Sequence, residues 1–344
     1  MNGKLIVAVA TLLFQTTVAA ASGDLMREFP APGDAPFPMS IRVGPKGAVW
    51  FLEYRGNAVS RIDPLTGAIV RYPIPSAKSE TLAMAVAPDG AVWVAEQDVN
   101  ALGRLDPATG KFEEIFLPTP RTNPGSLLVA RNGMVWTLGW NTDLLVSYDP
   151  STRKFSQRAT PSVQGNPYDL AEDRKGRIWF VQRSANKLTV YDPKSDRFDE
   201  YKIAPTVQSP IGTVIDRDGG IWYVKLVEGE LARFDPVTKE SATWAMPQNK
   251  GTQELTIDGR GDIWLVQSTD NRLLRFNVGA KHFQSYQLPE GNSRPNSVVA
   301  QGTERIWFTE GARNMVGYLD LERAGTVDKD MSVRFDPPAE MFRK

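Results

Sequence analysis

The sequence predicts an all-β fold, a seven-bladed β-propeller built from four-stranded antiparallel blades. One apolar segment with a central tryptophan recurs along the chain, as GAVWFLEY at 47–54, GAVWVAEQ at 90–97 and GRIWFVQR at 176–183. The tryptophans are spaced 43 residues apart, with a single spacing of 42, at Trp50, Trp93, Trp136, Trp179, Trp222, Trp264 and Trp307. A period of this length without helical periodicity is typical of a radial array of small sheets.

Each repeat contains four short alternating segments joined by turn residues. In the second repeat these are 81–88, 91–96, 101–106 and 111–118. Asp89-Gly90 between the first two predicts a two-residue hairpin turn, because both residues can adopt a positive φ. The Asp-Pro-x-Thr group that begins at Asp106 predicts the turn between the third and fourth strands. Each tryptophan is then expected to pack between neighbouring blades.

The two ends of the chain are predicted to close the ring together. Most repeats place 12 residues between the fourth-strand aromatic position and the next first-strand core residue, and Phe29 and Ile41 have the same separation. Residues 26–32 therefore read as a fourth strand without a preceding blade, and we expect them to complete the seventh blade. The segment 331–338, MSVRFDPP, is the alternative for that place.

Composition and the N-terminal segment bear on partners and location. The 344 residues contain 40 Lys plus Arg, 40 Asp plus Glu and no cysteine, so no basic field attracts nucleic acid and no disulfide is available. Residues 1–21 have the pattern of a signal peptide. We expect a propeller over 22–320, a C-terminal extension over 321–344, and a periplasmic or secreted monomer that is not inserted in a membrane after signal cleavage.

A binding site is expected where strands meet the mouth of the central channel. The residues three positions after each tryptophan vary: Glu53, Glu96, Gly139, Gln182, Lys225, Gln267 and Glu310. So do those just before each first strand: Met39, Leu82, Gly125, Tyr168, Ile211, Gln253 and Asn296. If Glu310, Glu53 and Glu96 converge, they could hold Mg²⁺ or Ca²⁺ or share a proton. The alternative is that they are rim charges paired with Arg55, Arg183 or Arg313.

Other side chains in the repeat are candidates for ligand contacts or proton transfer. Tyr54, Trp140 and Tyr168 could line a site for a ring-bearing ligand, with Gln182 and Gln267 beside them, or could simply pack between blades. A lowered pKa would make Lys225 a base. His282 is the only histidine, and its register places it at the outer edge of blade six, where a solvated side chain is expected.

Units such as SPIGTVIDRDGGIWYVKLVEGELARFDPVTKESATWAMP (209–247) and RPNSVVAQGTERIWFTEGARNMVGYLD (294–320) resemble the streptogramin B lyases, also called virginiamycin B lyases. The resemblance covers residues 25–320 and implies a seven-bladed propeller. It also implies Mg²⁺-assisted elimination that opens cyclic depsipeptides, with a histidine base at the position that begins the first strand of the last blades. The matching residues here are Gln253 and Asn296, and Glu310 alone lies near the family's metal carboxylates.

Three functions follow from these observations. The first is a lyase-like propeller without the catalytic histidines, which binds a small molecule or polymer at the channel mouth. The second is a metal-dependent lyase or lactone hydrolase, with Glu310, Lys225, Asn296 and Gln253 as catalytic candidates. A lactonase of this kind would take its ligands from Glu53, Glu310, Asn296 and Asp169. The third is a periplasmic interaction scaffold.

Overall fold

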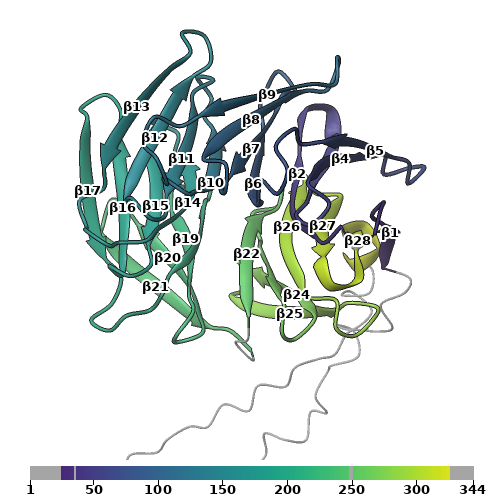
Figure 1. Ribbon diagram of the computed structural model, residues 1–344. Helices are drawn as coiled ribbons and strands as arrows, with labels where there is room; N and C mark the ends of the chain where they lie inside the picture. The colour runs from purple at the N-terminus through teal and green to yellow at the C-terminus, as the bar shows by residue number, and fades with distance from the viewer. Residues whose placement is uncertain (1–24, 35, 248–250, 326–344) are drawn as a thin grey trace, which may run out of the picture.

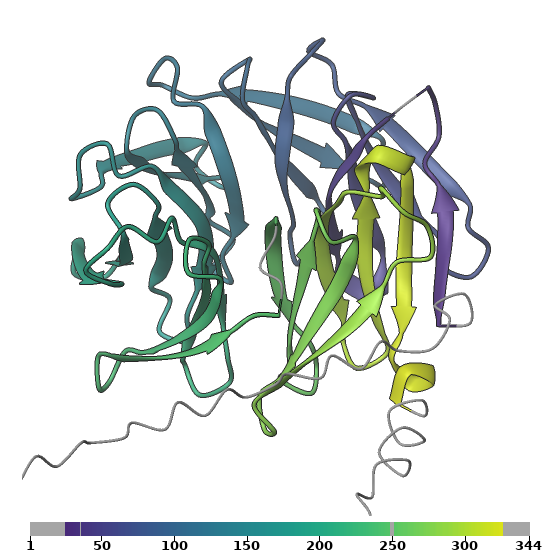
Figure 2. The same ribbon diagram turned by 90° about the horizontal axis from the view of Figure 1, so that it is seen from below.

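The computed structural model describes residues 25–34, 36–247 and 251–325, and these form seven four-stranded antiparallel sheets. The sheets follow one another around a ring in chain order, as the colours in Figure 1 and the view from below in Figure 2 show. Neighbouring innermost strands contact each other around the ring, and the first of them contacts the last. The predicted seven-bladed propeller is therefore confirmed.

The four strands of each blade occupy equivalent positions around the ring. The innermost strands are β2 (Pro38–Val43), β6 (Thr81–Val86), β10 (Pro124–Val129), β14 (Pro167–Glu172), β18 (Ile211–Ile215), β22 (Thr252–Ile257) and β26 (Pro295–Gln301). The second strands are β3 (Val49–Glu53), β7 (Val92–Glu96), β11 (Val135–Gly139), β15 (Ile178–Gln182), β19 (Ile221–Lys225), β23 (Ile263–Gln267) and β27 (Arg305–Glu310).

The outer half of each blade is formed by its third and fourth strands. The third strands are β4 (Ala58–Ile62), β8 (Ala101–Asp106), β12 (Leu144–Asp149), β16 (Lys187–Asp192), β20 (Glu230–Asp235), β24 (Arg272–Asn277) and β28 (Met315–Asp320). The outermost are β5 (Ile69–Pro73), β9 (Lys111–Phe116), β13 (Lys154–Ala159), β17 (Arg197–Lys202), β21 (Glu240–Ala245), β25 (His282–Gln287) and β1 (Met26–Pro30). Within the described ranges, the short 3₁₀ segments η2 (Pro45–Gly47) and η3 (Gly311–Arg313) connect strands.

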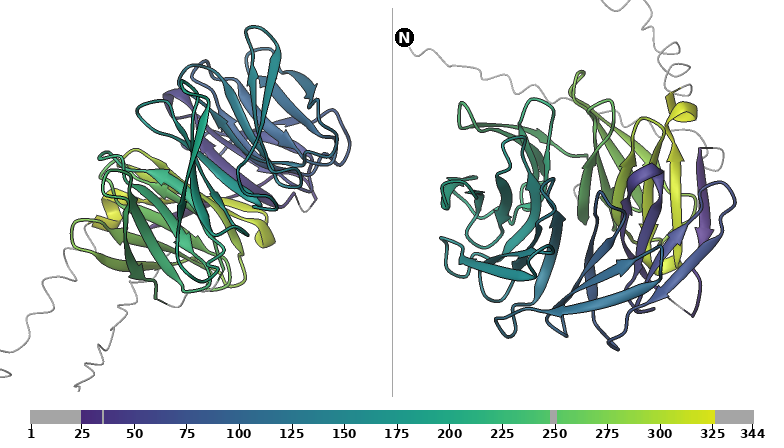
Figure 3. Two further views of the ribbon diagram at one scale, coloured as in Figure 1. Left: turned by 90° about the vertical axis from the view of Figure 1, so that its left-hand side faces the viewer. Right: turned by 90° about the horizontal axis from the view of Figure 1, so that it is seen from above.

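The N-terminal strand closes the ring, as the sequence predicts. β1 pairs with β28 in antiparallel register, from Met26 opposite Leu319 to Pro30 opposite Met315. Figure 3 shows β1 in purple beside the yellow C-terminal strands. Phe29 is 5% exposed and packs in one cluster with Trp307 and Val316. The alternative segment, 331–338, lies outside the described residues.

The seven repeat tryptophans join adjacent blades. All are at most 5% exposed. Trp50 of the first blade packs against Met84 and Val94 of the second, which removes apolar surface of both sheets from water. Burying an indole N–H requires an acceptor, and Trp179 donates to Asp173, six residues earlier, at 3.0 Å. The predicted inter-blade role of the tryptophan is confirmed.

The turn predictions are partly correct. Asp106 accepts hydrogen bonds from the Ala108 N–H and the Thr109 hydroxyl, both at 2.9 Å, so the Asp-Pro-x-Thr turn forms as expected. The prediction of a two-residue turn at Asp89-Gly90 is wrong. The Ala87 N–H donates to the Ala91 carbonyl and only Gly90 has a positive φ, of 91°, so the loop has a third residue. A turn followed by one left-handed glycine is the usual three-residue hairpin.

Removing β1 should destabilise the whole ring. A protein that begins at Gly33 is expected to melt at a lower temperature than one that begins at Asp24, because β28 loses its partner strand. Phe29→Ala alone should cost about 3 kcal/mol of unfolding free energy, since it leaves a cavity in a packed cluster. Thermal and urea unfolding measure both effects. Equal melting temperatures for the two lengths would show that the ring is held without β1.

Candidate functional site

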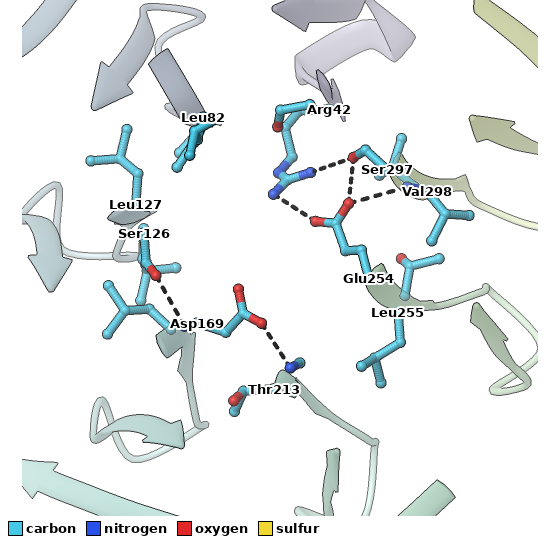
Figure 4. Close-up of a pocket in the computed structure, with 18 of the residues that line it drawn as sticks. Arg42, Leu82, Ser126, Leu127, Asp169, Thr213, Glu254, Leu255, Ser297 and Val298 are labelled. Carbon is cyan, nitrogen blue, oxygen red and sulfur yellow. Dashed lines mark hydrogen bonds and ion pairs between the residues drawn. The ribbon is translucent and has the colours of Figure 1, made fainter. Parts of the chain in front are cut away.

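The innermost strands share an irregularity near their first residue. In all seven, the pairing register with the second strand shifts there through a β-bulge or a similar distortion. A bulge bends the strand and re-aims nearby side chains. In blades four, six and seven these side chains are Asp169, Glu254 and Ser297, and Figure 4 shows them reaching into the space between the blades. The start of each innermost strand is therefore the place where the fold presents variable side chains to the centre.

A cavity of about 400 Å³ lies at the centre of the ring and takes lining residues from all seven blades. This volume falls within the roughly 300–1,000 Å³ of small-molecule sites. Five of the seven residues predicted from the starts of the first strands line it: Met39, Leu82, Gly125, Tyr168 and Asn296. Its other polar side chains include Ser40, Arg42, Ser126, Asp169, Thr213, Glu254 and Ser297.

One wall of the cavity is a charged cluster that joins blades one, six and seven. The Arg42 guanidinium lies 2.8 Å from the Glu254 carboxylate. The other Glu254 oxygen accepts from the Ser297 hydroxyl and, at 3.1 Å, from the Val298 N–H. Ser297 in turn accepts from the Ile41 N–H at 3.1 Å. The Glu254 carboxylate is therefore paired with Arg42 and fixed in place (Figure 4).

Asp169 stands on another side of the cavity. Its N–H donates to the Ser126 hydroxyl at 3.0 Å, and its Oδ2 accepts from the Gly212 N–H at 2.7 Å. Burial, followed by the repulsion of Glu254, raises the pKa of Asp169 to about 7. The ionised carboxylate of Asp169 is therefore less stable in the cavity than it would be in water.

Two aromatic residues also line the cavity. The ring centroids of Trp140 and Tyr168 are 5.3 Å apart, and the Arg183 guanidinium lies 5.3 Å from the Tyr168 centroid. Gly125 makes room for the indole, because a Cβ there would lie 1.8 Å from a Trp140 ring atom. Burial raises the pKa of Tyr168, so its phenol stays neutral. The sequence prediction named both aromatic residues as a lining, and they also pack against each other.

Four buried polar atoms of the lining have no hydrogen-bond partner within the described part of the protein. They are Ser40 Oγ, Trp140 Nε1, Thr213 Oγ1 and Asn296 Nδ2. A buried polar group without a partner costs roughly 1–3 kcal/mol, so such groups are normally satisfied by water or a ligand. Four residues that carry such an atom therefore surround one cavity.

The residues three positions after each tryptophan do not line the cavity, and among the described side chains no group of three carboxylates suited to a metal forms. Glu53 binds Ser60 and Arg71 within its own blade, and Glu310 binds Arg313 at 2.9 Å. The physical reason is the regular pleat at the end of the second strand, which directs these side chains across the third and fourth strands of the same sheet. The alternative of paired charges holds for Glu310 with Arg313, whereas Glu53 pairs with Arg71 rather than Arg55.

The equivalent residues of blades four, five and six have partners within their own blades too. Gln182 donates to the Thr189 hydroxyl at 2.7 Å, and Gln267 accepts from Arg272 at 2.6 Å. Lys225 donates to Glu228 at 3.1 Å and Glu230 at 3.0 Å. Although burial lowers it, these carboxylates leave the pKa of Lys225 raised, which contradicts the lowered pKa that a base would need.

Three further candidates do not contribute described side chains to the cavity. Tyr54 packs edge-on against Phe37, with ring centroids 6.4 Å apart, and is not among the lining residues. His282 is exposed at the start of the outermost strand β25, as expected. The side chain of Gln253 lies outside the described residues.

Comparison with known proteins identifies the family of this propeller. The profile of the "Virginiamycin B lyase family" matches residues 19–234 and 196–330. The chain belongs to this family. No curated protein matches it significantly.

Solved structures support the family's fold. Virginiamycin B lyase from Staphylococcus aureus superposes with a TM-score of 0.80 at 23% identity, over 86% of this chain and 99% of that one. A catalytically inactive histidine-to-alanine variant of that lyase with quinupristin gives the same values. The hydrazine synthase of Kuenenia stuttgartiensis has a TM-score of 0.69 at 14% identity, over 84% of this chain and 96% of that one. The fold is shared by proteins of different activity, and only the site can indicate function.

The metal implied by resemblance to the virginiamycin B lyases does not fit the residues present. Among the described side chains, no group of three or more His, Asp or Glu residues could hold a metal ion. Glu310 is already paired with Arg313, which also binds Glu28 at 3.0 Å. The four ligands considered for a lactonase are likewise divided, because Asn296 and Asp169 line the cavity while Glu53 and Glu310 are engaged within their blades.

Sequence reasoning missed Arg42, Glu254 and Ser297 as site residues. It compared the residue before each first strand, whereas the following position carries Asp169, Glu254 and Ser297. The signal was present, because that position reads Ser40, Ala83, Ser126, Asp169, Gly212, Glu254 and Ser297 and varies in charge and size. It was hidden because a regular strand would direct alternate residues to opposite faces, and a bulge breaks that rule.

Glu96 should make stability depend on pH. It is fully buried, and burial together with Glu114 raises its pKa from 4.5 to about 8. Across that interval the folded protein keeps a proton that the unfolded chain releases, so its stability falls as pH rises. Glu96→Gln should match the wild type near pH 4.5 and exceed it by about 2–4 kcal/mol at pH 8.5. Urea unfolding at several pH values measures the difference.

Glu240→Gln, on the exposed strand β21, is the matched control and should show no pH-dependent gain. A constant difference between Glu96→Gln and the wild type from pH 4.5 to 8.5 would mean that Glu96 ionises normally.

Proposed function

We propose that this protein is a ligand-binding member of the virginiamycin B lyase family, with a small molecule or the narrow end of a polymer held in the central cavity. The observation that supports this most is a cavity of ligand size whose lining includes four residues that each carry a partnerless polar atom. The fixed Arg42–Glu254 pair adds a rigid polar wall, and Trp140 and Tyr168 add apolar surface. Few polar groups in a concave, partly apolar site are typical of small-molecule recognition.

Elimination by a histidine base is not the function that these residues favour. In the S. aureus lyase, a histidine-to-alanine variant is catalytically inactive. The positions that the resemblance assigns to the family's histidines hold Gln253 and Asn296, and an amide does not accept a proton near neutral pH. His282, on the outermost strand, is remote from the cavity lining. A scaffold that retains the family's shape can bind without carrying out the family's reaction.

We propose further that the protein is exported. The support is the sequence of residues 1–21, which lies outside the described residues. Within the described ranges, no helix is both long enough and apolar enough to cross a bilayer. Fractionation of cells that express the full chain tests this, and a product that retains its N-terminus in the cytoplasm would contradict it.

Binding in the cavity should not depend on a metal. Monosaccharides, sugar amines and short peptides are tested for a rise in melting temperature, with Mg²⁺ and with EDTA, because a ligand of the native state stabilises it. We expect at least one probe to raise it equally under both conditions. Thr213→Val should then weaken that probe about 3–10-fold, since one hydrogen bond is lost.

Thr243→Val, at an exposed position of β21, is the control and should leave the affinity unchanged. If no probe raises the melting temperature, or if Thr213→Val leaves the affinity for the probe unchanged, the result would argue against a cavity ligand.

The lyase reaction itself should be absent. Mass spectrometry of cyclic depsipeptides and lactones incubated with the protein, with and without Mg²⁺, should show unchanged substrate, because no base stands at the family's histidine positions. A linear product of unchanged mass would demonstrate elimination with a substitute base. A product heavier by one water would demonstrate hydrolysis. Either product would replace the binding function with an enzymatic one.

A further inference from the structure

Asp169 is the cavity carboxylate that lacks a cation of its own. No Lys or Arg of the described residues lies within ion-pair distance of it, whereas Glu254 has Arg42 at 2.8 Å. The Gly212 N–H holds one Asp169 oxygen, and Figure 4 shows the other directed toward the centre of the cavity. The second carboxylate oxygen of Asp169 therefore faces the open cavity, where a hydrogen-bond donor could reach it.

The surroundings of Asp169 favour an added positive charge. The ionisable groups that face it are Tyr168, which stays neutral, Glu254, Arg42 and Arg183. Arg42 is committed to Glu254, and Arg183 lies over the Tyr168 ring. Burial and the repulsion of Glu254 outweigh the attraction of both arginines, since the net shift of the Asp169 pKa is upward. A cation beside Asp169 would relieve that penalty.

Uncharged polar groups complete the surroundings. Ser40 is 4% exposed and Thr213 is 7% exposed, and their hydroxyls have no partner among the described residues. Asn296 Nδ2 and Trp140 Nε1 are also buried without acceptors, but they pack against Gly311 and Gly125 rather than facing the cavity. Hydroxyl groups both donate and accept, so they can satisfy such a mixed set. The site thus combines one anion with several neutral hydrogen-bonding groups.

We infer that the cavity binds a small polyhydroxylated amine, with its protonated primary amino group held by Asp169 and its hydroxyls by hydroxyl side chains of the lining such as Ser40 and Thr213. This inference rests on the proposed ligand-binding function and adds the chemical class of the ligand. A primary ammonium has three donors and a compact charge, which suits one carboxylate oxygen with neighbouring hydroxyls better than a planar guanidinium does.

The test compares two probes that differ in one group. Glucamine, 1-amino-1-deoxyglucitol, carries an ammonium where glucitol carries a hydroxyl, and its alkylammonium remains charged through pH 8. Calorimetric titration of the full mature chain at pH 8 should give at least a tenfold higher affinity for glucamine. Asp169→Asn should remove that preference. Asp199→Asn, on the exposed face of β17 in the same blade, is the matched control and should retain it.

The pH dependence separates a charge contact from a purely structural role. Only the ionised form of Asp169 attracts the ammonium, so glucamine should bind about tenfold more weakly at pH 6 than at pH 8 in the wild type. In Asp169→Asn the affinity should be the same at both pH values. The melting temperature of the variant, measured without a probe, verifies that it is folded.

The possible results decide between the two proposals. Equal affinity for glucamine and glucitol, with Thr213→Val weakening both, would overturn the amine inference and keep a neutral cavity ligand. Glucamine binding that is unchanged in Asp169→Asn would also overturn it. If neither probe binds, the inference fails, and the separate probe set above still tests whether the cavity holds any ligand.

Discussion

The propeller depends on one repeated contact, the tryptophan that each second strand presents to the neighbouring blade. A four-stranded sheet of five- to seven-residue strands cannot bury enough apolar surface by itself to be stable. Packing Trp50 against Met84 and Val94 gives two adjacent blades a common core, and six analogous contacts extend this around the ring. Because the core lies between blades, side chains of the innermost strands that face the channel do not need to pack in the core. These side chains can therefore vary in charge and size.

The β-bulges near the start of the innermost strands direct some of these variable side chains into the cavity. In a regular strand, successive side chains point to opposite faces of the sheet, so half of the side chains of each innermost strand would pack against the neighbouring blade on one face. The irregular register at Asp169, Glu254 and Ser297 turns polar groups inward at points where the sheet can tolerate it. Arg42, Glu254 and Ser297 come from three different blades, and their mutual hydrogen bonds hold the wall rigid. Rigid polar groups lose little freedom when a ligand binds, which favours affinity.

The sequence predicted the fold well because its strongest signals are periodic. The tryptophan spacing gave the number of blades, and the distance from Phe29 to Ile41 gave the ring closure that β1 and β28 form. The site was predicted less well because it depends on side-chain direction. Glu53 and Glu310 were placed at the correct end of the second strand, but they reach outward across their own blades. Glu254 was overlooked since the bulge that re-aims it has no sequence signature of its own.

The pairing of β1 with β28 also has a consequence in time. A ribosome synthesises Met26 long before Leu319, so β1 has no partner strand until the segment that contains β28 has been made. Contacts between such distant segments are slow to form, because closing a long loop loses much chain entropy. The ring therefore closes only after β28 has been synthesised, which makes β1 the last strand to find its place.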